Sequence, residues 1–242
     1  MHKLKLELGG EGRGGGEGGG AFSVDSYRKR GSFSTTRLPL ISSSMSISNP
    51  VDGHVYVLTL GGTIDKDYPK LTSGYAFEFG NESAAERILK AHPNLGIAYI
   101  IKSICKKDSL EVKSNDRQDL VASISSIVAE NRNRDSNVRL RIVVTHGTDT
   151  MIETAMFIKN LIRNGEYIGR PAHFVVAFTG ATKPERFVDS DASFNVGCAV
   201  AATASCTPGS VVICMNGNVI PAEQCVRDEA SGLFRNKVGH IY

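Results

Sequence analysis

The sequence predicts an α/β fold with an open, mostly parallel sheet that carries helices on both faces. Short runs of β-branched and aliphatic residues alternate with amphipathic runs of helical length from Val51 onward. Such alternation is typical of parallel sheets, because a crossover helix must return the chain to the same edge before the next strand begins. We therefore expect one three-layer domain of the flavodoxin-like or Rossmann-like type.

The expected elements alternate in chain order, and turn or capping residues separate them. A Ser-x-x-Glu pattern at Ser83 and a Thr-x-x-Glu pattern at Thr150 predict capping boxes at two helix starts. Asn164-Gly165 predicts a helix end. The expected strands are His54–Leu60, Ile97–Ile104, Arg139–Thr145, His173–Thr179 and Ser210–Met215, and the expected helices are Ser83–His92, Asp116–Glu130, Met151–Arg163 and Ser193–Ser205.

Composition and charge exclude two classes of protein. The 242 residues are 41% hydrophobic and 22% charged, which suits one globular domain with a spare segment. No apolar run approaches the roughly 20 residues of a membrane span. The first 50 residues hold seven Lys or Arg and four Asp or Glu, which accounts for the whole net charge of +3. The remainder is neutral, so we expect neither a membrane protein nor a nucleic-acid binder with a broad basic face.

Cysteine and histidine usage argues against a disulfide framework and against a metal site. The cysteines are odd in number, lie in apolar contexts and form no C-x-x-C pattern, and the six histidines have no ligand spacing. We expect reduced thiols in the cytoplasm and no metal or organic cofactor. The five cysteines are Cys105, Cys198, Cys206, Cys214 and Cys225.

Residues 1–50 have the composition of a disordered, basic tail. Gly9–Gly20 is almost all glycine, and Ala21–Pro50 is rich in serine, so neither part can bury enough apolar surface to fold. The folded domain is expected at residues 51–242. Organellar import through a basic, Ser-rich transit segment is the alternative interpretation, and Met45 is an alternative start.

Hydroxyl and carboxylate groups follow three of the expected strands. Gly61-Gly62-Thr63 follows the first strand, Ser109 the second, and Thr148-Asp149 the third. Because parallel strands end at the same edge of a sheet, we expect these groups to lie together there. The two glycines permit a tight turn and are expected to leave amide N–H groups free to bind an oxyanion.

These segments resemble the bacterial-type L-asparaginase family. Leu60-Gly61-Gly62-Thr63-Ile64 is similar to the first family signature, and His146-Gly147-Thr148-Asp149-Thr150 is similar to the second. Asp108-Ser109-Leu110-Glu111 stands where the family carries its substrate-binding serine. The resemblance extends from about Val55 to Phe234. It implies a catalytic domain without the smaller C-terminal domain of familiar members, as in short single-domain asparaginases.

The resemblance implies hydrolysis of the L-asparagine side-chain amide to L-aspartate and ammonia through a threonine acyl-enzyme. Thr63 would be the nucleophile, helped by Tyr75 on a lid over residues 65–80. Thr148 would assist on the other face of the amide, and its N–H would help to bind the oxyanion. Asp149 would bind the α-ammonium group of the substrate.

The remaining implied roles concern the substrate carboxylate and the family lysine. Ser109 would hold the α-carboxylate, with Glu111 beside it in the same substrate-binding segment. Arg227 or Asp228 stands where the family lysine is expected. Arginine keeps the positive charge but cannot accept a proton near neutral pH. Leu60 replaces a family threonine, a change that we attribute to packing.

Other interpretations of the same residues remain open. Thr148 and Asp149 fit a helix start with no chemistry, and His146 fits a structural histidine better than a base. The alternative functions are an amidase for glutamine or another small amide, a catalytically impaired amino-acid-binding protein, and a nucleotide-binding domain that uses Gly61-Gly62. The last lacks both G-x-G-x-x-G and a Walker lysine. By resemblance we expect a homodimer or a higher homo-oligomer.

Overall fold

A computed structural model of the chain describes residues 54–67, 77–131, 139–165 and 174–237. The predicted tail at residues 1–50 and the predicted lid residue Tyr75 lie outside the described residues. No described helix is long and apolar enough to cross a membrane. All five cysteines are free thiols, in agreement with the reduced state predicted from the sequence.

The main sheet has six strands in the order β4-β1-β5-β6-β7-β8. The first five are parallel, and β8 pairs antiparallel with β7. Taken in chain order, the five parallel strands have the flavodoxin-like order 2-1-3-4-5, so the predicted fold class is confirmed. The strands are β1 (Val55–Gly61), β4 (Tyr99–Lys107), β5 (Leu140–Thr145), β6 (Phe174–Thr179), β7 (Val211–Met215) and β8 (Asn218–Pro221).

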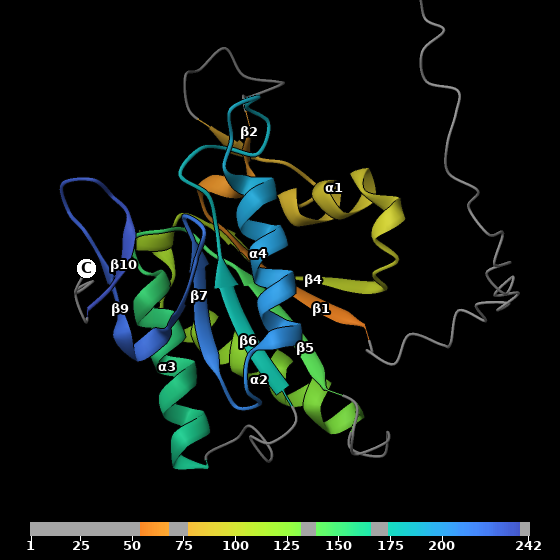
Figure 1. Ribbon diagram of the computed structural model, residues 1–242, viewed down its shortest axis with the longest axis vertical. Coiled ribbons are helices and arrows are strands. Elements are labelled where there is room, and N and C mark those ends of the chain that lie inside the picture. Colours follow the sequence, from red (N-terminus) through yellow and green to blue (C-terminus); the bar gives the residue numbers. More distant parts are fainter. Residues whose placement is uncertain (1–53, 68–76, 132–138, 166–173, 238–242) are drawn as a thin grey trace, which may run out of the picture. The chain divides into compact units, whose positions relative to one another are not determined.

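Four helices cover the two faces of this sheet (Figure 1). They are α1 (Ala84–Ala91), α2 (Ser114–Glu130), α3 (Met151–Asn164) and α4 (Ala192–Ser205). The apolar faces of α2 and α3 share one buried cluster with Leu58 and Val144 of the strands, and those of α1 and α4 share another with Val57 and Val143. Neighbouring strand residues therefore face opposite helix layers, as the alternation of side chains along a strand requires.

The predicted helix end at Gly165 is confirmed, but neither predicted capping box forms in full, and at Ser83 only the hydroxyl half of the box is present. The Ser83 hydroxyl accepts the Glu86 N–H (3.2 Å) and caps α1, and Gly165 ends α3 with a φ of 71°. No capping box forms at Thr150. Its hydroxyl donates instead to the Ser109 carbonyl (2.6 Å). This acceptor lies in the loop after β4, 41 positions earlier in the chain, so the sequence around Thr150 could not reveal it.

Three short antiparallel pairs add to the predicted elements. Strands β2 (Lys66–Asp67) and β3 (Glu78–Phe79) pair with each other, as do β9 (Cys225–Arg227) and β10 (Phe234–Asn236). Asn216-Gly217 is the two-residue turn between β7 and β8. Both residues have positive φ, 54° and 75°, as this type of hairpin turn requires.

The turn after β1 lies directly against the loop after β5. Gly62 has a φ of 84°, and a Cβ at this position would overlap the backbone nitrogen of Gly147. A Cβ on Gly147 would in turn lie 2.6 Å from the Ser109 Cβ in the loop after β4. The ends of three adjacent strands thus approach at backbone distance, which only glycine permits.

We predict that Gly62→Ala destabilises the fold far more than Gly96→Ala, the matched control. Gly96 also has positive φ, 61°, but nothing lies within 4 Å of an added Cβ. The control should lose about 1–2 kcal/mol from backbone strain alone, and Gly62→Ala about 3–5 kcal/mol because overlap adds to strain. Urea unfolding followed by circular dichroism measures both. Equal losses would mean that Gly62 and Gly147 are not in contact.

Candidate active site

The candidate site lies where the order of strands reverses. From β1 the chain crosses to β4 on one side and later to β5 on the other, which leaves a crevice at the carboxyl ends of β1 and β5. Thr63 follows β1 in a 3₁₀ turn (Thr63–Asp65), and Thr148 follows β5 and is 8% exposed. The fold thus brings both predicted threonines to the crevice in which this class of sheet binds ligands.

Ser109 and Asp149 form a direct hydrogen-bonded pair at this edge. The buried Ser109 hydroxyl donates to Asp149 Oδ2 (3.1 Å) and lies 3.3 Å from the Asp149 N–H, which it accepts. The Thr150 hydroxyl binds the Ser109 carbonyl, so three contacts join the loops after β4 and β5. A serine hydroxyl and a carboxylate are therefore held side by side.

Arg227 reaches this pair from the β9–β10 hairpin. Its Nη1 lies 2.5 Å from Asp149 Oδ1, and its Nε donates to the Gly232 carbonyl (3.3 Å). The two charged side chains are 35% and 42% exposed, so solvent screens the pair and it adds little to stability. Its effect is to orient Asp149, whose other oxygen remains on Ser109.

A network of asparagines positions the hairpin that carries Arg227. The Asn195 amide group on α4 donates to the Gly180 carbonyl (3.1 Å), and its oxygen accepts the Asn216 N–H (3.2 Å). The Asn216 side chain then accepts the N–H of Phe234 on β10 (3.0 Å). The end of β6, helix α4, the β7–β8 turn and the β9–β10 hairpin are thereby fixed to one another.

His146 is a structural residue of the β5–α3 loop. It is completely buried, its Nδ1 lies 2.8 Å from the Gly147 carbonyl, and its Nε2 lies 3.0 Å from the Thr154 hydroxyl. Burial lowers the pKa of His146, which keeps the ring neutral. Nδ1 must then donate to Gly147, and Nε2 accepts from Thr154. Both nitrogens are engaged, so His146 has no free position for a substrate proton.

The backbone amides at the site differ in part from the expectation. The Gly62 N–H is not free, because it donates to the Lys107 carbonyl (2.9 Å). Residue Lys107 pairs with Gly61 across the β1–β4 ladder, and this pairing extends past the end of β1. Within the described part of the chain, no acceptor takes the N–H of Thr63 or of Thr148. These two amides are the available donors for an oxyanion.

Three further residues named in the sequence analysis do not contact the Ser109–Asp149 pair. Glu111 is exposed, and its carboxylate accepts the Asp108 N–H (3.4 Å) in the capping box of a 3₁₀ turn, so it does not join Ser109 and Asp149. Leu60 is buried in the core that α2 and α3 share, in agreement with a packing role. Asp228 accepts hydrogen bonds from Ser231 within its own hairpin, which leaves Arg227 as the cation at Asp149.

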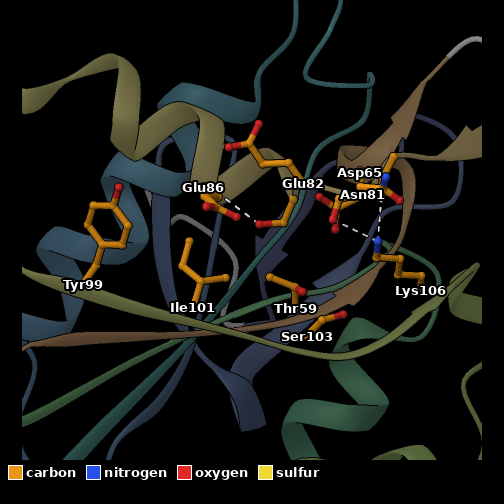
Figure 2. A pocket seen from close by; sticks show the side chains of 11 residues that line it. Thr59, Asp65, Asn81, Glu82, Glu86, Tyr99, Ile101, Ser103 and Lys106 are labelled. Atoms are coloured by element: carbon orange, nitrogen blue, oxygen red, sulfur yellow. Dashed lines mark hydrogen bonds between the residues drawn. The ribbon is translucent and has the colours of Figure 1, made fainter.

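Asp65 is a buried carboxylate that the sequence analysis placed only at the start of a lid. It is 7% exposed, its Oδ1 accepts the Ala84 N–H at the start of α1 (2.6 Å), and it shares the 3₁₀ turn of Thr63 (Figure 2). Burial raises the pKa of Asp65 to about 6, against the Ala84 hydrogen bond and the charges of Arg87 and Lys106, which lower it. No local motif signals this role, because Ala84 is 19 residues away.

Comparisons with known proteins give the family and the fold of this chain. The family model described as "Asparaginase, N-terminal" matches residues 54–234. L-asparaginase 2 from Escherichia coli (strain K12) is 28% identical over 170 residues, which cover 69% of this chain and 44% of that protein.

Two solved structures share the fold. The thermostable L-asparaginase from Thermococcus kodakarensis superposes with a TM-score of 0.58 at 21% identity. This match covers 76% of this chain and 51% of that protein. The probable cytoplasmic L-asparaginase from Campylobacter jejuni superposes with a TM-score of 0.58 at 23% identity. This match covers 76% of this chain and 52% of that protein. The chain therefore spans about half the length of the relatives that it matches.

We predict that Asp65 makes the fold less stable as the pH rises. Its pKa is higher in the folded protein than in the unfolded chain, so the folded state binds more protons between about pH 4 and pH 6, and the stability falls with rising pH in that window. Between about pH 4 and pH 7, wild type should lose about 3 kcal/mol relative to Asp65→Asn. Asp119→Asn, at an exposed position on α2, is the control. Parallel stability curves for wild type and Asp65→Asn would contradict this prediction.

Proposed function

The chain belongs to the asparaginase family, and on that basis we propose that it hydrolyses the side-chain amide of L-asparagine to L-aspartate and ammonia. The observation that carries the proposal is the contact between the Gly62 turn and the Gly147 loop, which brings Thr63 and Thr148 to one crevice. Two hydroxyls, a carboxylate and two amide donors with no described acceptor then belong to the loops at the carboxyl edge of the sheet.

In the proposed reaction the Thr63 hydroxyl oxygen attacks the amide carbon, and its proton passes by way of a neighbouring group to the leaving nitrogen. The carbonyl oxygen becomes an oxyanion, which the N–H groups of Thr63 and Thr148 are placed to stabilise. Ammonia leaves, and an ester to Thr63 remains. Water, positioned by the Thr148 hydroxyl, then hydrolyses this ester and releases aspartate. By family resemblance Tyr75 is the proposed partner of Thr63.

Asp149 and Ser109 are proposed to bind the α-ammonium and α-carboxylate groups of the substrate. In the free protein they bind each other, and Asp149 also binds Arg227. Substrate binding must therefore exchange the Ser109–Asp149 hydrogen bond for contacts with the two substrate groups. The Arg227 ion pair can persist during this exchange, because it uses the other oxygen of Asp149. This keeps the carboxylate oriented while the substrate enters.

A second candidate function is amino-acid binding without turnover, and Arg227 favours it. Arginine remains protonated at any physiological pH and cannot accept a proton from Thr148. If proton transfer at Thr148 needs a base in this position, the pocket would bind aspartate and asparagine but hydrolyse slowly. Hydrolysis of glutamine or another small amide is a third candidate, and a comparison of substrates separates it from the first.

We predict that wild type releases ammonia from L-asparagine and that Thr63→Ala and Thr148→Ala each lower kcat/KM at least about a thousandfold, as expected for residues that contact the reacting atoms. Thr182→Ala is the control, because this exposed residue binds Asp191 and has no described hydrogen bond to Ser109, Thr148 or Asp149. Ammonia release is measured across asparagine, glutamine and other small amides. An active Thr63→Ala variant would contradict the mechanism, and an inert wild type that binds aspartate would favour the second candidate.

Arg227→Lys is predicted to raise kcat by about tenfold or more with little change in KM, because lysine restores a group that can exchange a proton. Arg235→Lys, a neighbour on β10 that also faces a carboxylate, is the matched control and should leave kcat unchanged. Steady-state kinetics with L-asparagine gives both constants. A lower kcat for Arg227→Lys would show that the arginine itself is adapted to this site.

A further inference from the structure

An ion pair joins the segment that carries the proposed nucleophile to the loop that carries the proposed carboxylate ligand. Lys66 follows Thr63 by three residues, and its Nζ donates to Asp108 Oδ2 at 2.6 Å. Asp108 directly precedes Ser109 in the loop after β4. The two partners are 42 positions apart, and neither has a role in the proposed reaction. This contact therefore links two parts of the site that follow different strands.

Each partner is closely coupled to the site residue beside it. The Lys66 N–H donates to the Thr63 carbonyl and so closes the 3₁₀ turn that contains Thr63. Asp108 is the N-cap of the 3₁₀ turn that begins at Ser109, and its Oδ1 accepts the Leu110 N–H (3.3 Å). One carboxylate thus caps the Ser109 turn with one oxygen and binds Lys66 with the other. A displacement of either turn relative to the other would distort the ion pair.

A second link between the same loops runs through the glycine contacts. The turn at Gly62 lies against Gly147, and Gly147 lies against Ser109. That link passes through the residue that precedes Thr63, whereas Lys66 lies after Thr63. Two connections, one on each side of Thr63 in the chain, restrict rotation of the turn as well as its translation. Thr63 is thereby held relative to Ser109 both in position and in orientation.

The ion pair affects geometry more than stability. The side chains of Lys66 and Asp108 are 23% and 38% exposed, so solvent screens their attraction. The hydrogen bond from Lys66 holds the pKa of the Asp108 carboxyl below its usual value, so the carboxylate stays ionised at neutral pH. Loss of the pair should leave the protein folded, so its effect on the reaction can be measured.

Another ion pair holds the same short strand from a different loop. Arg186 lies between β6 and α4, and its Nε is 3.2 Å from Asp67 Oδ2. Asp67 is the neighbour of Lys66 on β2. Arg186 has no described hydrogen bond or ion pair with the Ser109 loop. Its contact therefore fixes β2 without fixing the separation of β2 from Ser109.

The separation between Thr63 and Ser109 decides which amide a bound amino acid presents for attack. In the proposed reaction Ser109 holds the α-carboxylate, and Thr63 attacks the amide carbon. Glutamine has one methylene more than asparagine between these two groups, so a site of fixed separation cannot place both amide carbons equally well. Discrimination by one methylene is worth about 10- to 200-fold in kcat/KM.

We propose that the Lys66–Asp108 ion pair fixes the separation of Thr63 and Ser109 and thereby makes the site selective for asparagine over glutamine. This role depends on the proposed function, which assigns the attack to Thr63. Lys66 acts through the turn that it closes, so it is a positioning residue and does not touch the substrate. Without the ion pair the turn gains freedom, attack on asparagine becomes slower, and glutamine is disfavoured less.

The test is the ratio of kcat/KM for L-asparagine to kcat/KM for L-glutamine, measured by ammonia release from the full chain. Wild type should favour asparagine at least about tenfold. Lys66→Met and Asp108→Asn should each lower the ratio about fivefold, and Asn at position 108 keeps the N-cap of the Ser109 turn. The double variant should lower the ratio no further, because both changes remove the same contact. Lys66→Arg keeps the charge and should retain most of the selectivity.

Arg186→Met is the matched control, because it removes the other ion pair of β2, and its ratio should equal that of wild type. A merely structural role of Lys66 would lower kcat/KM for both amides equally. The ratio in Lys66→Met would then match wild type, and the proposal would be overturned. Equal shifts in Lys66→Met and Arg186→Met would overturn it too, as would equal kcat/KM of wild type for the two amides.

Failure of this proposal is distinguishable from failure of the proposed function. Wild type that hydrolyses neither amide would overturn both together. Active, asparagine-selective wild type with an unchanged ratio in Lys66→Met would overturn the role of the ion pair alone. Thermal unfolding of each variant confirms that the protein used in the kinetics is folded.

Discussion

The contact between the backbones of Gly62 and Gly147 is the constraint on which the rest of the site depends. Glycine at both positions lets the turn after β1 and the loop after β5 approach more closely than any side chain would allow. Ser109, in the loop after β4, packs against Gly147 from the other side. Because the sheet order reverses at β1, these loops border the crevice in which such folds bind ligands. Topology therefore brings the loops that carry Thr63 and Thr148 to the same edge of the sheet, although 85 positions separate the two residues in the sequence.

Asp149 is the point at which long-range contacts meet. It binds Ser109 after β4 and Arg227 on β9, and its own loop is fixed by the buried ring of His146. The hairpin that delivers Arg227 is positioned in turn by Asn216 in the β7–β8 turn. Most of this network uses neutral hydrogen bonds between segments, which fix geometry without the large desolvation cost of buried charges. The exposed ion pair then adjusts the charge at the site and contributes little to folding.

The sequence predicted the fold and much of the site because both depend on local patterns. Alternating strands and helices determine a parallel sheet, and a parallel sheet places Thr63 and Thr148 at one edge. The features that it missed depend on partners far along the chain. The Thr150 hydroxyl donates to the Ser109 carbonyl and does not cap the helix that Thr150 precedes. The buried Asp65 carboxylate accepts the N–H of Ala84, at the start of a helix 19 residues later. The sequence placed Arg227 where the family has lysine, but only the hairpin geometry shows that it reaches Asp149.

The proposed reaction depends on a covalent ester between Thr63 and the substrate. The most direct measurement is acid quenching of the enzyme during turnover of L-asparagine, followed by mass spectrometry of the peptide that contains Thr63. We predict an aspartyl adduct on Thr63, which accumulates further in Thr148→Ala if Thr148 positions the hydrolytic water. Ammonia release with an adduct on another residue, or with none under any quench condition, would contradict the account.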